Sequence, residues 1–282
     1  MNNVSQSEVL TERQQRELDY HREHAKNYKF MLEEEFPFEV TEQTSETRRW
    51  WNAYWEMFWF LQQQNVHQKK VMIVGCGFGD DALRLAKMGA DVYAFDLSPE
   101  SLDIAKQVAE REKLSITFAE MPAEKLTYDS DFFDLVLARD ILHHVDIPAT
   151  MQEIVRVSKD GALFIYDEVY SHSFTDKIRH STLVEKKLYP LMANFVYDNR
   201  NPYITEDERK LTEVDCDAIN QALDRLVMRK YFYFIVNRVI PEKYDILNKI
   251  DRTMLTVFGY LGRYLAGRAL VAGSIDKTKP IN

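Results

Sequence analysis

Short apolar runs alternate with amphipathic stretches through the middle of the chain. Apolar runs rich in Val, Ile and Phe are typical of buried strands, whereas apolar positions at helical spacing are typical of helices that cover a sheet. Because the two patterns alternate, they indicate a parallel sheet with helices on both faces. The predicted strands are 71–74, 91–96, 115–119, 133–138 and 162–168, and the predicted helices between them are 81–88, 99–113 and 148–157.

The segments on either side of this core predict elements that extend it. Two β-like runs, 228–236 and 269–274, are interpreted as a sixth and a seventh strand. Further helices are predicted at 8–28, 47–64, 213–226 and 242–261. The chain is therefore expected to form a Rossmann-like, doubly wound α/β sheet of seven strands.

Three parts are expected along the chain. Residues 1–68 form an N-terminal helical arm or lid, residues 69–170 form the ligand-binding core, and residues 171–282 complete the same domain. The last part also supplies helical insertions. We expect these over the carboxyl ends of the strands, where ligands bind in open α/β sheets.

The turn after the first strand carries the most informative chemistry. Gly75, Gly77 and Gly79 lie at alternate positions before a helix, which brings bare backbone close to a ligand. Asp96 ends the second strand, where a carboxylate can accept hydrogen bonds from both hydroxyls of a ribose. A tight turn and a helix-capping carboxylate would explain these residues without a ligand, but Ser98 can cap the next helix itself. We therefore expect a nucleoside site.

The residues after the third glycine narrow the choice of nucleoside. Dinucleotide folds use a further glycine beside a pyrophosphate. This chain has Asp80 and Asp81 instead, whose carboxylates suit the positive end of a helix dipole but would repel a pyrophosphate. They tolerate a ligand that carries an ammonium and a sulfonium, so the pattern favours S-adenosylmethionine (SAM) over NAD.

Five motifs in this order resemble those of the class I SAM-dependent methyltransferases, in particular the subtype that modifies quinone-pathway and natural-product small molecules. The motifs are Val74–Gly79, Ala94–Ser98, Ala123–Leu126, Phe133–Leu137 and Leu142–Val145. The resemblance implies SAM as the cofactor. It also implies that the seventh strand pairs antiparallel between the fifth and the sixth.

The resemblance is incomplete on the adenine side. Family members usually carry an acidic residue before the alanine of the third motif, where it accepts from the adenine amino group, and here that position is Pro122. Adenine is then expected to use backbone groups near Met121 and Ala123 and apolar contact with Leu97 and Met121. Arg139, directly after the fourth strand, is also assigned to the cofactor site.

Two histidines are the candidate catalytic residues. In the family the fourth strand ends beside the reactive methyl, and His143 and His144 follow that strand, so a neutral imidazole there could serve as a general base. Related natural-product O-methyltransferases use such a pair with an acid at the end of the fifth strand, here Asp167 or Glu168. We favour His144 as the base, then His143, with Asp167 orienting it. The alternative is a pair of ordinary histidines at a helix start.

All four tryptophans lie within the predicted helix 47–64. We expect this helix to pack on the sheet edge or in an interface. The alternative is a lid whose Trp51, Tyr54 or Trp55 encloses an aromatic or cationic acceptor. A similar choice, between a solvated helix face and contact with the methionine end of the cofactor, applies to Tyr20, His21, His24 and Tyr28.

Composition restricts the partners. The formal net charge is −9 without a basic stripe, so a nucleic-acid substrate is not expected. No apolar run is long enough to span a bilayer, and the N-terminus lacks the apolar stretch of a signal peptide. Cys76 and Cys216 form no metal-binding or disulfide pattern, so no metal is expected and a reducing cytoplasm fits. Segment 255–272 is interpreted as buried helix and strand, with uptake of a lipophilic acceptor from a membrane as the alternative.

The sequence thus predicts an enzyme that transfers a methyl group from SAM to a small organic acceptor, with a hydroxyl favoured. The context would be biosynthesis of a secondary metabolite or a quinone-like compound. Such a reaction depends mainly on alignment and exclusion of water. Three alternatives stay open: a SAM-fold enzyme with other chemistry, a NAD-dependent oxidoreductase, and a SAM-binding protein without activity. The acceptor's identity and a homodimer are also left open.

Overall fold

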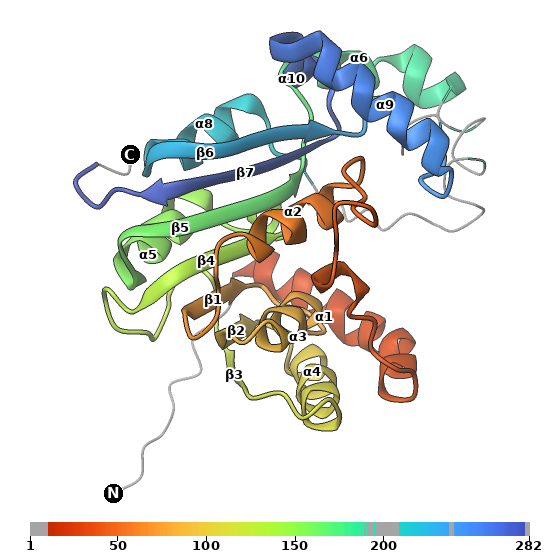
Figure 1. Cartoon of the computed structure of the whole chain (residues 1–282). Helices are drawn as coiled ribbons and strands as arrows, with labels where there is room; N and C mark the ends of the chain where they lie inside the picture. The colour runs from red at the N-terminus through yellow and green to blue at the C-terminus, as the bar shows by residue number, and fades with distance from the viewer. Residues whose placement is uncertain (1–10, 189, 191–194, 196–208, 237–239, 280–282) are drawn as a thin grey trace, which may run out of the picture.

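A seven-stranded sheet runs through the centre of the molecule (Figure 1). The computed structural model describes residues 11–188, 190, 195, 209–236 and 240–279. The strands lie in the order β3-β2-β1-β4-β5-β7-β6. Their bounds are β1 Lys70–Val74, β2 Asp91–Asp96, β3 Ile116–Glu120, β4 Phe133–Arg139, β5 Ser158–Val169, β6 Leu223–Phe232 and β7 Arg268–Ile275.

The pairing of the strands confirms the predicted fold. Strands β1 to β5 are parallel, whereas β7 is antiparallel to both β5 and β6. The chain winds outwards from β1 to β3 on one side and from β4 on the other. The carboxyl ends of β1 and β4 therefore lie at the point where the winding reverses, which is where open α/β sheets bind ligands.

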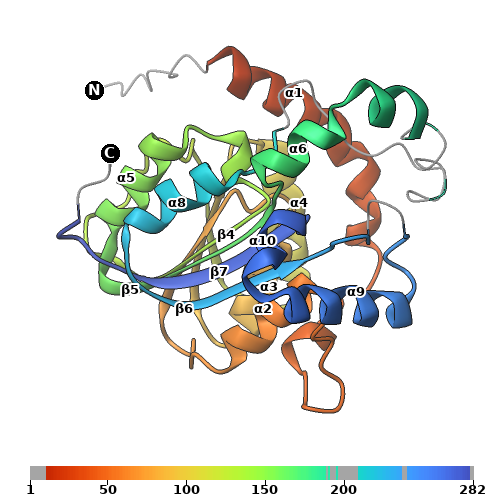
Figure 2. The same cartoon turned by 90° about the horizontal axis from the view of Figure 1, so that it is seen from above.

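Helices cover both faces of the sheet, so that side chains on either side of each central strand are buried. One face packs against α5 (Ile147–Val157) and α8 (Glu213–Gln221). The other packs against α2 (Ala53–Gln62) and α3 (Asp80–Lys87), with α4 (Pro99–Arg111) beside them. Figure 2 shows the two layers of helices on either side of the sheet.

The N-terminal arm and the C-terminal insertions lie near the carboxyl ends of the strands (Figures 1 and 2). The arm contains α1 Glu12–Ala25 and the short 3-10 helices η1 Lys26–Leu32 and η2 Glu39–Thr41. The insertion after β5 contains α6 Ser173–Arg179 and the π-helical turn η4 Val184–Leu188. The insertion after β6 contains α9 Asp245–Phe258, η5 Gly259–Leu261 and α10 Gly262–Leu265.

The helix predicted at 47–64 is shorter than expected. It begins at Ala53, because the side chain of Asn52 caps it by accepting from the backbone N–H of Trp55. Trp50 and Trp51 therefore precede the helix. In the arm, the helix predicted at 8–28 gives way to a 3-10 helix after Ala25, and its first three residues lie outside the described part.

The boundary before the sixth strand was also predicted wrongly. Helix α8 ends at Gln221 and β6 begins at Leu223, so residues 223–226 are strand rather than helix, and β6 ends at Phe232 rather than 236. Bulges interrupt the pairing of β6 with β7, which breaks the strict alternation that marks a strand in a sequence. The last long helix similarly ends at Phe258, because Gly259 turns the chain with a φ of 53°.

Candidate active site

A cavity of about 750 Å³ opens at the carboxyl ends of β1 and β4. The turns after β1, β2 and β4 form most of its wall, and the N-terminal arm contributes the rest. The residues predicted from sequence that line it are Gly75, Gly77, Asp96, Leu97, Met121, Ala123, Arg139, His143 and His144. Three other predicted residues, Gly79, Pro122 and Asp167, are not among its lining residues.

The glycines of the first turn have different tasks. All three have positive φ angles, which favours glycine at each. A Cβ on Gly75 would lie 2.5 Å from the Ile141 side chain, and one on Gly79 would lie 2.9 Å from the Ala105 Cβ of α4. A Cβ on Gly77 would meet no atom within 4 Å. Gly79 therefore allows close packing of the turn on α4, whereas Gly77 leaves room at the cavity wall.

Asp96 is held at the end of β2 by backbone donors. Its Oδ2 accepts from the N–H of Gly77 at 2.7 Å, and its Oδ1 accepts from the N–H of Ser98 at 2.9 Å. The carboxylate is buried but lines the cavity. Each carboxylate oxygen has a second lone pair, so Asp96 can accept two further hydrogen bonds from a ligand.

Apolar side chains flank this carboxylate. Leu97, Met121 and Phe78 line the same part of the cavity, and the ring of Phe78 stacks on Tyr28 of the arm with centroids 4.1 Å apart. Burial raises the pKa of the Cys76 thiol well above its usual value. That cysteine is therefore a neutral part of the wall and not a nucleophile.

The arm is bonded to the rim of the cavity. Arg13 donates from Nη2 to the carbonyl oxygen of His143 at 2.6 Å, and Gln14 donates from Nε2 to Glu124 at 3.1 Å. Gln14 and Tyr28 both line the cavity. The other three arm residues predicted to contact the cofactor have side chains outside the described part: Tyr20, His21 and His24.

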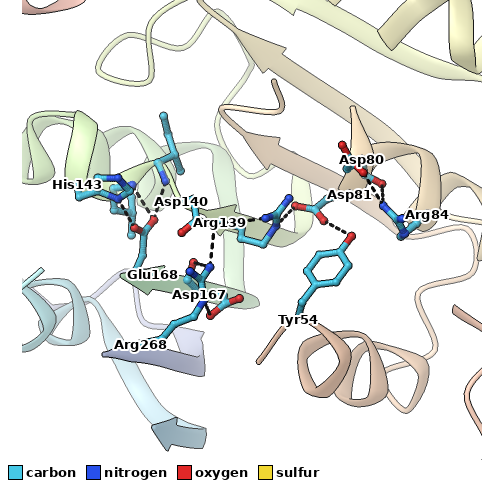
Figure 3. A network of polar contacts seen from close by, with 12 residues as sticks. Tyr54, Asp80, Asp81, Arg84, Arg139, Asp140, His143, Asp167, Glu168 and Arg268 are labelled. Carbon is cyan, nitrogen blue, oxygen red and sulfur yellow. Dashed lines mark hydrogen bonds and ion pairs between the residues drawn. The ribbon is translucent and has the colours of Figure 1, made fainter. Parts of the chain in front are cut away.

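A network of acids and arginines borders the cavity (Figure 3). Arg139 donates from Nε to Asp81 at 2.8 Å, and the Tyr54 hydroxyl donates to the other oxygen of Asp81 at 3.0 Å. Burial, followed by the negative charge of Asp81, raises the pKa of the Tyr54 hydroxyl. Arg139 therefore lines the cavity as one member of an anchored network that joins β4 to α2 and α3.

Asp167 does not contact the histidine pair, contrary to the sequence prediction. Its Oδ1 accepts from Nε of Arg268 at 2.7 Å, and Arg268 also donates to Asp140 at 2.8 Å. The second oxygen, Oδ2, is buried without a hydrogen-bond partner among the described residues. Burial, together with the negative charge of the nearby Asp140, raises the pKa of Asp167 to about 6, although the charge of Arg268 opposes the increase.

Glu168 is the acid that contacts a histidine (Figure 3). Its Oε2 lies 2.7 Å from Nδ1 of His143, and its Oε1 accepts from the backbone N–H groups of Ile141 and Leu142, both at 2.8 Å. Both side chains are buried. Because an ionised carboxylate only accepts, we assign the proton to Nδ1 of His143, which leaves Nε2 as the acceptor.

The two histidines lie in the 3-10 turn η3 (Leu142–His144), ahead of helix α5, whose N-cap is Asp146. Their rings pack together with centroids 4.0 Å apart. His144 is half-buried and lines the cavity with His143. The structure thus brings both candidate bases to the cavity but gives the carboxylate partner to His143.

The aromatic helix contributes one side chain to the cavity, Tyr54. Three tryptophans instead pack against cationic side chains: Arg48 lies over Trp59 at 4.8 Å, Arg49 over Trp55 at 4.3 Å and Lys249 over Trp51 at 4.2 Å. The interior face of α2 is formed by Met57, Phe58 and Leu61. This arrangement supports the interpretation of a packed helix over that of an aromatic lid.

Two residues of the site carry little sequence signal. Arg268 begins the last strand and reaches the cavity, but in the sequence it is a single arginine beside an apolar run. Glu168 could be named from sequence only as an alternative to Asp167. Neighbouring side chains on a strand point to opposite faces, and the sequence does not indicate which face the histidine turn occupies.

The described residues contain no group of three or more His, Cys, Asp or Glu side chains placed to hold a metal ion. None of their helices combines the length and the apolarity needed to cross a bilayer.

Residues 72–166 match the model of a family described as a methyltransferase domain. Two relatives are each named ubiquinone biosynthesis O-methyltransferase. The protein from Coxiella burnetii is 34% identical over 113 residues, which cover 36% of this chain and 48% of that protein. The protein from Actinobacillus pleuropneumoniae is 31% identical over 114 residues, which cover 37% and 49%. The chain spans about half the length of the curated relatives it matches.

Solved structures share the fold over a longer stretch. Magnesium protoporphyrin IX methyltransferase from Synechocystis PCC 6803 aligns with a TM-score of 0.55 and 12% identity, over 95% of this chain and 99% of that one. The (4+2)-cyclase SpnF aligns with a TM-score of 0.53 and 17% identity, over 80% and 82%. The segment that matches the methyltransferase-domain model runs from β1 to β5, so the similarity covers the part of the sheet that forms most of the cavity wall.

Proposed function

We propose that the chain transfers a methyl group from SAM to a hydroxyl of a small organic acceptor. The observation that carries the proposal is one cavity that holds both halves of the required site. Asp96 and the Gly77 turn lie on the cofactor side, and the His143–Glu168 pair lies on the acceptor side. The names of the relatives support an acceptor on a quinone pathway, where the hydroxyl would be phenolic.

The residues present fit SAM. Asp96 retains two lone pairs for the ribose hydroxyls, and the open space at Gly77 admits the ligand close to the backbone. Leu97 and Met121 offer apolar surface to the adenine. Asp80 lines the cavity and adds negative charge near a cationic ligand. When bound, SAM supplies an electrophilic methyl group on a sulfonium with a good leaving group.

The chain's own residues then position the acceptor and move its proton. His143 Nε2 accepts the proton of the acceptor hydroxyl, which makes the oxygen a better nucleophile. Glu168 keeps the ring in the tautomer whose Nε2 carries no proton, and it stabilises the imidazolium that forms. The arm, bonded through Arg13 and Gln14, helps to exclude water from the cavity.

The proposal includes a cytoplasmic location, which the two unpaired cysteines, Cys76 and Cys216, support. The acidic net charge of −9 supports a small-molecule acceptor over a nucleic acid.

Two measurements test the proposal. Calorimetric titration should show binding of SAM and of S-adenosylhomocysteine but not of NADH. Incubation with methyl-labelled SAM and panels of phenolic, amino and enolic acceptors should then label a phenol. Tight SAM binding without transfer to any panel or to a metabolite extract would contradict a methyltransferase and favour a silent binding protein. A product formed from a substrate without gain of the label would indicate other chemistry on the same fold.

A further inference from the structure

Two of the three buried residues of helix α9 are polar, and the third is Leu255. The polar residues are Asn248 and Asp251, and Asp251 accepts hydrogen bonds from the backbone N–H groups of Phe234 and Ile235 at 2.8 and 2.7 Å. Large apolar residues are exposed on the same helix, with Ile246 among the most exposed. A helix of a soluble domain normally shows the reverse pattern. The helix therefore presents an apolar surface that the described protein does not cover.

The neighbouring elements extend this surface. Helix α10 contacts both α6 and α9, and the three lie beyond the carboxyl end of the sheet (Figures 1 and 2). We call the exposed apolar side chains of these elements and of η5 the apolar face. Its most exposed members, between 49% and 79% accessible, are Phe174, Ile178, Ile246, Ile250, Val257, Tyr260 and Leu261. Clustering of apolar residues on this scale is typical of a binding surface.

The segments that form the apolar face, together with the turn η4 that contacts α6, are basic in an acidic chain. Residues 173–188 contain four Lys or Arg and two Asp or Glu. Residues 242–265 contain four Lys or Arg and three Asp or Glu. The whole chain, by contrast, has 36 Lys or Arg and 45 Asp or Glu. Exposed lysines among them include Lys177, Lys186 and Lys187. The partner that combines strong negative charge with an apolar interior is an anionic lipid bilayer.

We propose that the apolar face docks on the surface of an anionic membrane. The apolar side chains would enter the boundary between headgroups and acyl chains, and the lysines would contact the anionic headgroups. The alternative of a second copy is disfavoured. A two-fold contact through this face would bring two surfaces of the same, basic charge together.

The apolar face lies close to the cavity, so docking would bring the cavity near the membrane. Val169 and Arg268 line the cavity, and α6 follows Val169 closely in the chain while α10 directly precedes Arg268. His172, the N-cap of α6, packs on Tyr264 of α10 with ring centroids 4.2 Å apart. A docked molecule would thus hold its acceptor side close to the bilayer. This last step rests on the proposed function and implies a lipophilic acceptor, whereas the docking itself does not.

The test is co-sedimentation of the full chain with vesicles of phosphatidylcholine alone and of phosphatidylcholine with phosphatidylglycerol. We expect binding to the mixed vesicles that weakens at high salt. The triple variant Ile246→Ser, Ile250→Ser, Val257→Ser should bind at least tenfold more weakly. The pair Lys186→Gln, Lys187→Gln should weaken binding by about fivefold per lysine. The matched controls Val214→Ser on α8, 67% exposed, and Lys106→Gln on α4 should bind as the original chain does.

The outcomes separate this proposal from the proposed function. Calorimetry with SAM on the same variants reports the cavity alone, and it should be unchanged whether or not vesicles bind. Absence of binding to the mixed vesicles by the unaltered chain would overturn membrane docking and leave the enzyme proposal intact. If the triple variant instead converts a dimer into a monomer in light scattering, the face is an interface between copies, and the membrane proposal is wrong.

Discussion

The carboxylate of Glu168 bonds at once to the ring of His143 and to the backbone of the turn that carries it. The contact to Nδ1 is 2.7 Å long, and two backbone N–H groups of the turn donate to the other oxygen. One side chain at the end of β5 therefore sets both the position of the histidine and the ring nitrogen that carries the proton. This relationship makes His143 a stronger candidate than His144 for the base.

Replacing His143 with alanine tests that assignment. We expect His143→Ala to lower turnover by about a hundredfold or more, because the acceptor hydroxyl loses its base. SAM affinity should be nearly unchanged, since the ribose contacts lie elsewhere in the cavity. The rate of the unaltered enzyme should rise with pH across the range in which imidazole loses its proton, and this limb should flatten in the variant. The matched control is His144→Ala. A larger loss in that control, with the pH limb removed, would make His144 the base.

Glu168→Gln tests the positioning role. An amide in this place can no longer stabilise the imidazolium, but it can still accept from the two backbone N–H groups. We expect kcat to fall with little change in the acceptor KM, and the pH limb of the rate to move to lower pH, because a histidine without its carboxylate partner loses its proton more easily. If the role of Glu168 is merely structural, the substitution should instead lower the free energy of unfolding and leave the pH profile of the remaining activity unaltered. Urea unfolding and the pH profile together decide between these roles.

Asp96→Ala tests the cofactor side. The loss of charge-assisted hydrogen bonds to the ribose should weaken SAM binding by about 1.5–3 kcal/mol, roughly tenfold to a hundredfold. Asp91→Ala at the other, exposed end of β2 is the matched control and should leave SAM affinity unchanged. Calorimetry measures both variants. Equal affinity in Asp96→Ala and the unaltered chain would contradict the placement of the ribose at this carboxylate.

The central sheet could be predicted from the sequence because buried parallel strands are nearly continuous apolar runs. β1 and β4, each covered by helices on both faces, stand out in this way. The start of the edge strand β6 does not stand out in this way. Asp224 and Arg225 face solvent there, and the pairing of β6 with β7 is bulged. Because of the exposed residues and the bulge, the first residues of β6 resemble the end of a helix in the sequence.

The sequence predicted those residues of the site that directly follow the end of a strand. Asp96 and the Gly77 turn are fixed by the first two strands and were found in the cavity wall. The partner of the histidine depends on which face of β5 the η3 turn occupies, and that is decided by tertiary packing. For the same reason Arg268, which takes Asp167 away from the histidines, could not be assigned from its sequence neighbours.

Asp167→Asn should change how stability depends on pH. The folded pKa of Asp167 is about 6, above the value of about 4 expected in the unfolded chain, so the folded state holds the extra proton between these values. Its contribution is therefore fully present below pH ~4 and is lost as pH rises to ~6, by on the order of 2 kcal/mol. The amide of the variant has no such proton to lose.

The difference in free energy of unfolding, variant minus original, should thus rise from pH 4 to pH 7. Urea unfolding at several pH values measures it. A constant difference would show that Asp167 is ionised throughout and that Arg268 outweighs its burial.

The final prediction separates the glycines of the first turn. Gly77, Gly79 and the remote Gly161 all have positive φ, so alanine at each costs about 1–2 kcal/mol of strain. Gly161→Ala meets no atom within 4 Å and serves as the control for strain alone. Gly79→Ala should lose more stability than this control, because its Cβ would lie 2.9 Å from Ala105, and the protein that remains folded should bind SAM with little change. Gly77→Ala should match the control in stability but weaken SAM binding, because its Cβ occupies space at the cavity wall.

Urea unfolding and calorimetry measure the stability and the SAM affinity of each variant. If Gly79→Ala lowers SAM affinity as strongly as Gly77→Ala does at equal stability, then both glycines contact the cofactor, and packing on α4 is not the reason for a glycine at position 79.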